Sequence, residues 1–198
     1  MVETAKLIAF ALSFVAIAVL LALAVRQLTS RRFQFWPPPV EGGWQHATFA
    51  WLFRGFFYSL VALSLLEFRW PEESRDVWQS LAGVILLVVG FALALRITFS
   101  MGWRNAFGEK RGVVTTGWFG LSRHPVYVAS WVGQLGWALL VASWLVSLLL
   151  LAWAMLYLVA PYLEEPWLEE QYGDAYRRYQ ERVPRFFAWP RSRQSPRS

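Results

Sequence analysis

The chain has 198 residues, of which 57% are hydrophobic and 16% are charged, and its formal net charge is +6. A soluble domain carries roughly 25% charged residues, so the low charge content indicates a surface that faces lipid. The absence of cysteine excludes disulfides, thiolate metal sites and a cysteine nucleophile, and the distant histidines His46 and His124 predict no metal cluster.

Three apolar segments in the first half of the chain are predicted to cross the membrane. The first, Leu7 to Val25, is long enough for a hydrocarbon core of about 30 Å. Ala22-Leu23-Ala24 resembles a signal-peptide cleavage site, but the apolar run exceeds the usual core of about 7–15 residues and the residues before it are barely basic. We therefore expect a retained anchor. The second span is Ala47 to Leu66, and the third is Trp78 to Phe99.

The stretch from Val126 to Leu163 carries no formal charge. As one helix it would be nearly twice as long as a membrane span. It must therefore fold back on itself, and Ala142-Ser143-Trp144 is the expected turn. The resulting hairpin of two rather short helices brings the total to about five spans.

Charges in the connections orient these spans. Lys and Arg favour the cytoplasmic side. The first connection, the third connection and the C-terminal tail are basic, so they are predicted to lie inside, with the N-terminus outside. Because the arginines lie between apolar spans rather than on one face, nucleic-acid binding is not expected. The basic residues are Arg26, Arg31 and Arg32 in the first connection and Arg104, Lys110, Arg111 and Arg123 in the third. The second connection has Glu67, Glu72, Glu73 and Asp76 against only Arg69 and Arg75, so it is predicted to lie outside.

The N-terminal half contains a tryptophan-proline segment, two arginines within or near predicted spans, and several tryptophans near span ends. Trp36-Pro37-Pro38-Pro39 is a rigid, non-helical segment that either braces the fold or covers a site. Arg54 lies inside the second span, so we expect it to face a polar cavity or a carboxylate, whereas Arg96 near a span end can snorkel to the interface. Tryptophans near the span ends indicate interfacial belts. They are Trp44, Trp70, Trp78, Trp103 and Trp144.

Two polar motifs precede the fourth span. The loop from Thr115 to Ser122 has glycines that let backbone approach a ligand, although an ordinary turn explains it equally well. Arg123 and His124 come directly before Pro125, which suits the first turn of a helix. The donor-rich N-terminus of that helix would hold a carboxylate or phosphate. For Arg123, the alternative is a cation that snorkels to the membrane interface.

Two carboxylates, Glu164 and Glu165, directly follow the fifth span. Adjacent carboxylates at a membrane interface are expensive to desolvate unless they are partnered. Arg123 and the Arg177/Arg178 pair are the candidate partners, and we expect one of the two glutamates to be solvated.

An amphipathic helix is predicted after the glutamates, because apolar positions recur there every three or four residues. Gly173 should interrupt this helix, and Asp174 can cap its second segment. The apolar positions are Leu168, Tyr172, Ala175, Tyr176, Tyr179 and Val183.

Taken in order, these motifs resemble the integral-membrane methyltransferases typified by isoprenylcysteine carboxyl methyltransferase and phospholipid N-methyltransferases. The resemblance covers residues 105–187. Ala129 stands where the family has glycine, and Leu158 to Pro161 lack a basic residue that many relatives carry, so the acceptor need not be an isoprenylcysteine. The matching motifs are Gly117-Trp118-Phe119, Arg123-His124-Pro125-Val126-Tyr127, Glu164-Glu165-Pro166-Trp167-Leu168, Tyr172-Gly173-Asp174-Ala175-Tyr176-Arg177-Arg178-Tyr179 and Val183-Pro184-Arg185.

The resemblance implies an all-α polytopic membrane protein in which residues 105–187 bind S-adenosylmethionine at the cytoplasmic face. A single membrane domain would span 1–190, followed by a disordered basic tail at 191–198. The acceptor would be a hydrophobic or lipid-like small molecule that enters from the membrane. Glu164 and Arg123 would be catalytic, and the cofactor-binding residues would be Gly117, His124, Tyr127, Glu165, Leu168 and Tyr176.

Two alternatives remain open at this stage. Sterol-reductase-like membrane proteins resemble the same region but use NADPH. They usually have more spans and an Asn in place of the motif histidine, so His124 favours methyl transfer. A non-enzymatic partner protein with a relic site is the second alternative. The identity of the acceptor and the oligomeric state do not follow from the residues.

Overall fold

Long apolar helices account for most of the chain in the computed structural model, which describes residues 1–30, 32–40, 42–70, 74–102 and 112–187, without the side chains of residues 74 and 75. No β-strand occurs within these ranges. The predicted tail at 191–198 and the charges Arg104, Lys110 and Arg111 lie outside the described residues.

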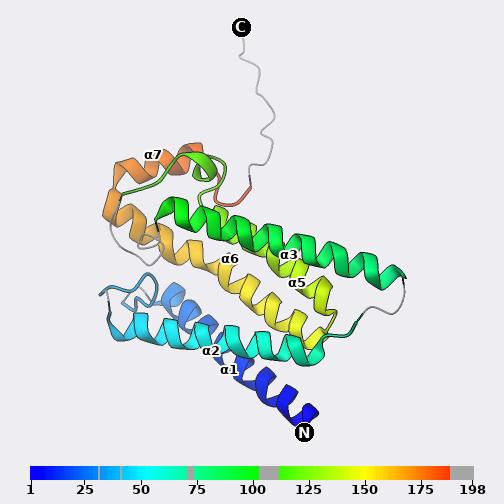
Figure 1. Cartoon of the computed structure of the whole chain (residues 1–198). Helices are drawn as coiled ribbons and strands as arrows, with labels where there is room; N and C mark the ends of the chain where they lie inside the picture. Colours follow the sequence, from blue (N-terminus) through cyan, green and yellow to red (C-terminus); the bar gives the residue numbers. More distant parts are fainter. Residues whose placement is uncertain (31, 41, 71–73, 103–111, 188–198) are drawn as a thin grey trace.

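The five predicted apolar helices are all present, which confirms the all-α polytopic fold. Four of them are long and apolar enough to cross a membrane, whereas α5 has 17 residues and would reach about 26 Å at 1.5 Å per residue. Large apolar side chains are exposed along these helices, as a lipid-facing surface requires. The elements are α1 (Val2–Thr29), α2 (Trp44–Glu67), α3 (Ser74–Met101), the 3-10 helix η1 (Gly117–Gly120), α5 (Pro125–Val141), α6 (Trp144–Tyr172) and α7 (Asp174–Arg182) (Figure 1).

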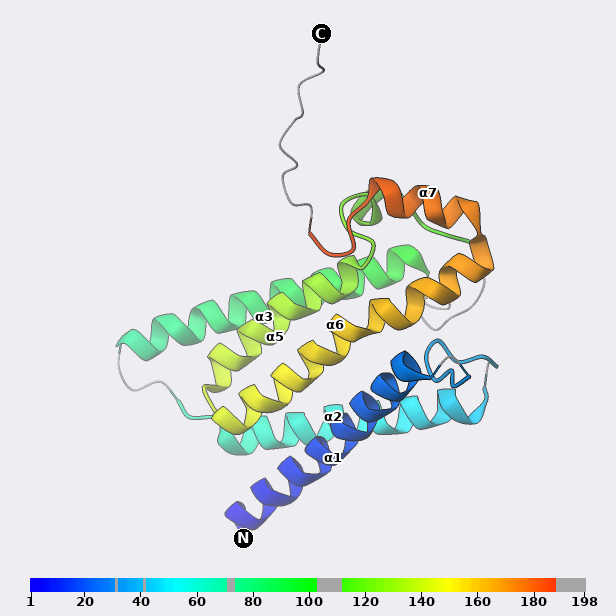
Figure 2. The same cartoon turned by 180° about the vertical axis from the view of Figure 1, so that it is seen from behind.

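Helix α6 occupies the middle of the bundle and contacts α1, α2, α5 and α7. Helices α1 and α2 form a pair on one side of it, and α3 packs along α5 on the other (Figures 1 and 2). The N-terminus lies at the same end as the α5–α6 turn, and α7 lies at the opposite end, here called the site end. The successive long helices therefore run alternately toward and away from the site end, as predicted from the charges in the connections.

The α5–α6 turn lies where the uncharged stretch was predicted to fold back. Helix α5 ends at Val141, and Ala142 adopts a left-handed conformation with φ 51° that reverses the chain. The Ser143 hydroxyl donates to Glu67 Oε2 at 2.8 Å. Lys6 Nζ lies 3.0 Å from Glu67 Oε1. The turn is thereby joined to α1 and α2 at this end of the bundle.

Helix α6 does not end at Leu163, as the following glutamates suggested, but continues to Tyr172. Charge usually marks the end of a membrane helix, yet here both carboxylates have polar partners within the protein. Gly173 interrupts the helix as predicted, with φ 53°. Asp174 is not the cap of the next segment, because Gly173 occupies the N-cap position and Asp174 is the first residue of α7.

Arg54 pairs with no carboxylate of the described residues. Phe56, Leu60 and Leu63 form the buried face of α2. Since each residue turns the helix by about 100°, Arg54 lies roughly opposite Phe56, and it is exposed. Arg96 on α3 is exposed as well. The described tryptophans near the span ends are exposed as expected for interfacial belts; they are Trp44, Trp70, Trp78 and Trp144.

Glycines allow α3 and α5 to pack with their backbones in contact, as small residues do between membrane helices. A Cβ atom added at Gly90 would lie 2.6 Å from Gly133 Cα and 2.9 Å from Ala129 O. One added at Gly83 would lie 2.8 Å from the backbone N of Leu140. This contact fixes α5, and with it the start of the helix that carries the polar motif, against α3.

Replacing Gly90 with alanine should lower the free energy of unfolding by about 1–3 kcal/mol, because the added methyl group meets backbone that has no room to yield. Thermal unfolding of the detergent-purified protein measures this. Gly55→Ala in α2 is the matched control, since a Cβ there meets nothing within 4 Å. Equal melting temperatures for the two variants would contradict the packing described here.

Candidate functional site

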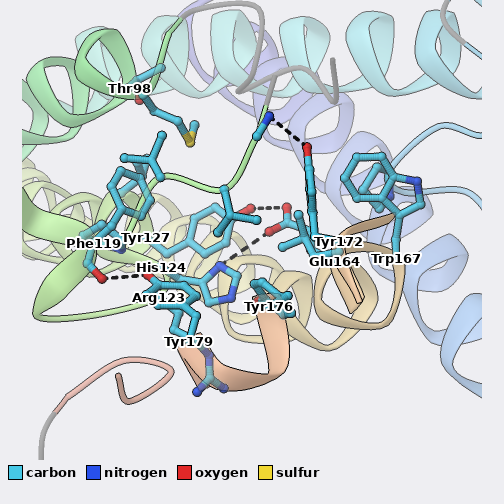
Figure 3. A pocket seen from close by; sticks show the side chains of 18 of the residues that line it. Thr98, Phe119, Arg123, His124, Tyr127, Glu164, Trp167, Tyr172, Tyr176 and Tyr179 are labelled. Atoms are coloured by element: carbon cyan, nitrogen blue, oxygen red, sulfur yellow. Dashed lines mark hydrogen bonds and ion pairs between the residues drawn. The ribbon is translucent and has the colours of Figure 1, made fainter. Parts of the chain in front are cut away.

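A cavity of about 190 Å³ lies at the site end. Its walls come from the end of α3, η1, the start of α5, the last turns of α6 and α7, together with residues 36–37 before α2. Figure 3 shows Glu164, Tyr127 and His124 converging in this space. The lining residues with polar or aromatic side chains are Trp36, Thr98, Phe119, Arg123, His124, Tyr127, Glu164, Trp167, Tyr172, Tyr176 and Tyr179.

The start of α5 is tied to the segment that follows α7. Pro125 is the first residue of α5, so Arg123 and His124 precede the helix and their backbone N–H groups are free to pair elsewhere. Arg123 N donates to Pro184 O at 2.9 Å, and His124 N donates to Arg185 O at 3.2 Å. Two motifs that are far apart in the sequence therefore form one wall of the site.

Glu165 is the centre of a buried ionic cluster. Its side chain is 6% exposed. Arg123 lies with Nε and Nη2 each 2.9 Å from Glu165 Oε1. Arg185 Nη2 lies 2.6 Å from Oε2, and this ion pair raises the pKa of the Arg185 guanidinium. The remaining nitrogen of Arg123, Nη1, donates to the carbonyl oxygens of Gln180 and Val183 at 3.1 and 2.7 Å. The cluster joins α5, α6 and the chain after α7.

Glu164 has different surroundings, because its carboxylate lines the cavity. The Tyr127 hydroxyl and the Trp36 indole N–H both donate to Glu164 Oε1, the latter at 2.8 Å. The other oxygen, Oε2, lies 3.5 Å from His124 Nδ1. His124 Nε2 in turn lies 3.2 Å from Glu165 Oε1, so the imidazole stands between the two carboxylates. Glu165 is buried, whereas the Glu164 side chain is 16% exposed, and both carboxylates have partners within the protein.

Two tyrosines of α7 complete the cavity. The Tyr179 hydroxyl donates to Phe119 O at 2.6 Å, and burial raises the pKa of Tyr179 to about 12, so it stays neutral at physiological pH. Burial also raises the pKa of Tyr176. The Tyr176 hydroxyl is buried and finds no hydrogen-bond partner among the described residues. A buried polar group of this kind usually has a partner, and Tyr176 lines the cavity.

The predicted site residues fall into three groups. Most line the cavity: Arg123, His124, Tyr127, Glu164, Leu168 and Tyr176. Glu165 is among the ionic partners of Arg123 and is absent from the lining. Gly117 is exposed at the start of η1, with φ 63°, and its loop contributes Phe119 to the cavity instead.

The carboxylate partners were only partly predicted. Arg123 does bind Glu165, but Arg177 pairs with Glu169 at 2.6 Å on the surface. Arg185 takes the place expected of the Arg177/Arg178 pair. Its position after Val183-Pro184 in the last motif was the available signal. Trp36 was missed as a partner of Glu164, since nothing in its tryptophan-proline segment indicates a distant carboxylate.

Comparisons with known proteins bear on this site. The model of a family described as phospholipid methyltransferase matches residues 78–175. Human protein-S-isoprenylcysteine O-methyltransferase is 29% identical over 141 residues, which cover 64% of this chain and 49% of the relative. Human phosphatidylethanolamine N-methyltransferase is 35% identical over 96 residues, which cover 46% of this chain and 48% of the relative.

The chain spans about half the length of these two curated relatives. No solved structure matches at a significant level. The family resemblance drawn from the motifs is confirmed, and the reductase alternative is not favoured, because both relatives are named as methyltransferases.

Proposed function

We propose that this membrane protein transfers a methyl group from S-adenosylmethionine to a hydrophobic or lipid-like acceptor, because residues 78–175 match the model of the phospholipid methyltransferase family. The observation that carries the proposal is the placement of Glu164, a carboxylate held by two donors in the wall of a largely aromatic cavity. Methyl transfer needs alignment and exclusion of water, and these are what such a cavity provides.

The cavity residues fit the chemistry of S-adenosylmethionine. The ligand has an amino-acid end, ribose hydroxyls and an adenine ring, which call for hydrogen-bonding groups beside aromatic surface. Tyr176 offers an unpartnered hydroxyl, and Phe119 and Tyr172 offer aromatic faces. We propose that His124, Tyr127, Leu168 and Tyr176 hold it, with Glu165 acting indirectly by fixing Arg123. When bound, S-adenosylmethionine supplies an electrophilic methyl group on a positively charged sulfur.

Glu164 is the proposed general base. An amine or thiol acceptor must lose a proton, and a base within hydrogen-bond reach contributes typically 10²–10⁴-fold to the rate. A carboxylate acceptor would need no base. The guanidinium nitrogens of Arg123 are occupied by Glu165 and two backbone carbonyls, so we propose that Arg123 organises the wall and does not take part in proton transfer. Correct positioning of the reactants can contribute up to about 7–11 kcal/mol.

The site end is proposed to face the cytoplasm. It carries several basic residues of the described chain, including Arg26, Arg123, Arg178, Arg182 and Arg185. Basic residues favour the cytoplasmic side of a membrane. Water-soluble S-adenosylmethionine would then enter from the cytoplasm, while the acceptor would reach the cavity from the bilayer.

Binding of radiolabelled S-adenosylmethionine to the detergent-purified protein tests the proposal. We expect saturable binding and a rise in melting temperature, because a ligand that binds only the folded protein stabilises it. NADPH at the same concentrations should leave the melting temperature unchanged. Absence of saturable S-adenosylmethionine binding, or stabilisation by NADPH instead, would overturn the assignment.

A further inference from the structure

Trp36 brings the N-terminal part of the chain into the site. It lies in the connection between α1 and α2, outside the residues that the family model matches. With Pro37 it lines the same cavity as Glu164, and its indole Nε1 donates to Glu164 Oε1 at 2.8 Å. The hydrogen bond joins two residues that are 128 positions apart.

Gln27, near the end of α1, holds the tryptophan in place. Its side-chain oxygen accepts hydrogen bonds from the backbone N–H groups of Phe35 and Trp36, each at 2.7 Å. Its nitrogen donates to Trp36 O at 2.6 Å. The indole ring also stacks on Phe49 of α2, with 4.4 Å between ring centroids. The direction of the indole N–H is therefore set by α1 and α2 before any ligand binds.

The two donors on Glu164 leave its oxygens unequal. Oε1 accepts from both Trp36, in the connection between α1 and α2, and Tyr127, on α5. Oε2 faces His124 Nδ1 at 3.5 Å, which is longer than a good hydrogen bond. Hydrogen bonds to a charged group are stronger than neutral ones. Together the two donors restrict the orientation of the carboxylate and leave Oε2 as the less strongly held oxygen.

We propose that Trp36 is a positioning residue that acts through Glu164 and holds Oε2 toward the acceptor during methyl transfer. The inference rests on the proposed function. It means that α1 and α2, which hold Trp36, contribute to the orientation of Glu164. The Gln27–Trp36 arrangement supplies this side chain from a part of the chain that the family match does not reach.

Trp36→Phe tests the role, since it keeps an aromatic ring against Phe49 and removes the N–H donor together with part of the indole ring. Phosphatidylethanolamine in mixed micelles, whose amine must lose a proton during methylation, serves as the acceptor probe. We expect kcat to fall about ten- to hundredfold, as for loss of a hydrogen bond to a charged group, while S-adenosylmethionine affinity stays within about twofold. Trp153→Phe is the matched control for the loss of ring volume, because the buried Trp153 indole makes no hydrogen bond with Glu164 in the described structure. Equal kcat for both variants would overturn the proposal.

A double-mutant cycle separates positioning from a general structural effect. In a Glu164→Gln background, Trp36→Phe should change the residual kcat by less than about twofold, because the proton-accepting carboxylate that Trp36 positions is already gone. An undiminished loss in that background would overturn the proposal. Gln27→Leu, which releases the backbone of Trp36, should reproduce the loss of kcat.

A second readout needs no turnover. In protein labelled with ¹⁵N-tryptophan, the indole resonance that disappears in Trp36→Phe should move upfield in Glu164→Gln, where the charged acceptor is gone. A resonance that does not respond to Glu164→Gln would overturn the inference whatever the activity. A wild-type protein that binds no S-adenosylmethionine but shows this response would overturn the proposed function instead, so the two failures are distinguishable.

Discussion

Replacing Glu165 with glutamine should abolish turnover and lower the free energy of unfolding by about 3–5 kcal/mol, the usual effect of removing one partner from a buried ion pair. Glutamine keeps the shape of the side chain but removes the negative charge that Arg123 and Arg185 share. Two guanidinium groups would then face each other without an anion. The start of α5 and the segment after α7 should separate, and binding of S-adenosylmethionine should be lost with them.

Glu169→Gln provides the comparison for this prediction. Glu169 lies four residues further along α6 and also pairs with an arginine, Arg177, but its side chain is 37% exposed and that of Arg177 60%. Exposed ion pairs contribute about 0–1 kcal/mol, so this variant should keep its melting temperature and its activity. Thermal unfolding and radiolabelled cofactor binding, measured on both variants, give the answer. If Glu165→Gln unfolds and binds like Glu169→Gln, the buried cluster does not organise the site.

The fold could be predicted largely from the sequence because membrane helices are recognised by long apolar segments without charge. The stretch without charge was too long for one span, which predicted the turn that Ala142 makes. The end of α6 was predicted wrongly for a related reason. Charge normally marks the end of a span, but Glu164 and Glu165 are partnered inside the protein, so the helix continues to Tyr172.

The site was predicted where residues lie close in sequence or belong to a recurring motif. His124 and Tyr127 share one helix start, and Glu164 belongs to a recognisable pair. Partners supplied by tertiary packing could not be predicted. Arg185 reaches Glu165 because backbone hydrogen bonds hold Pro184 and Arg185 beside Arg123 and His124.

Arg54 shows the opposite error. An intramembrane charge was expected to find a polar partner, but the buried face of α2 is formed by Phe56, Leu60 and Leu63. Position on the helix, which depends on what packs against it, places Arg54 on the exposed side. A charged residue within a span is expected to be functional only when its side chain points toward the interior of the bundle or a cavity.

Replacing Glu164 with glutamine should separate catalysis from binding. Glutamine can still accept from Trp36 and Tyr127, so the cavity wall should stay in place and S-adenosylmethionine affinity should change by only a few fold. The proton-accepting group is lost, and kcat toward the amine of phosphatidylethanolamine should fall about 10²–10⁴-fold, the range for a general base. Glu170→Gln, on the exposed side of α6, is the matched control and should retain activity.

The same variant tests why Glu164 is needed, if it is assayed with two acceptors. An amine must give up a proton during methylation, whereas the carboxylate of an S-prenylcysteine is already deprotonated at neutral pH. A base should therefore matter for the first acceptor and not for the second. Should Glu164→Gln lose activity equally with both, the carboxylate would be aligning the reactants rather than accepting a proton. Undiminished turnover of phosphatidylethanolamine by Glu164→Gln would remove Glu164 from the mechanism, because no rate could then depend on its charge.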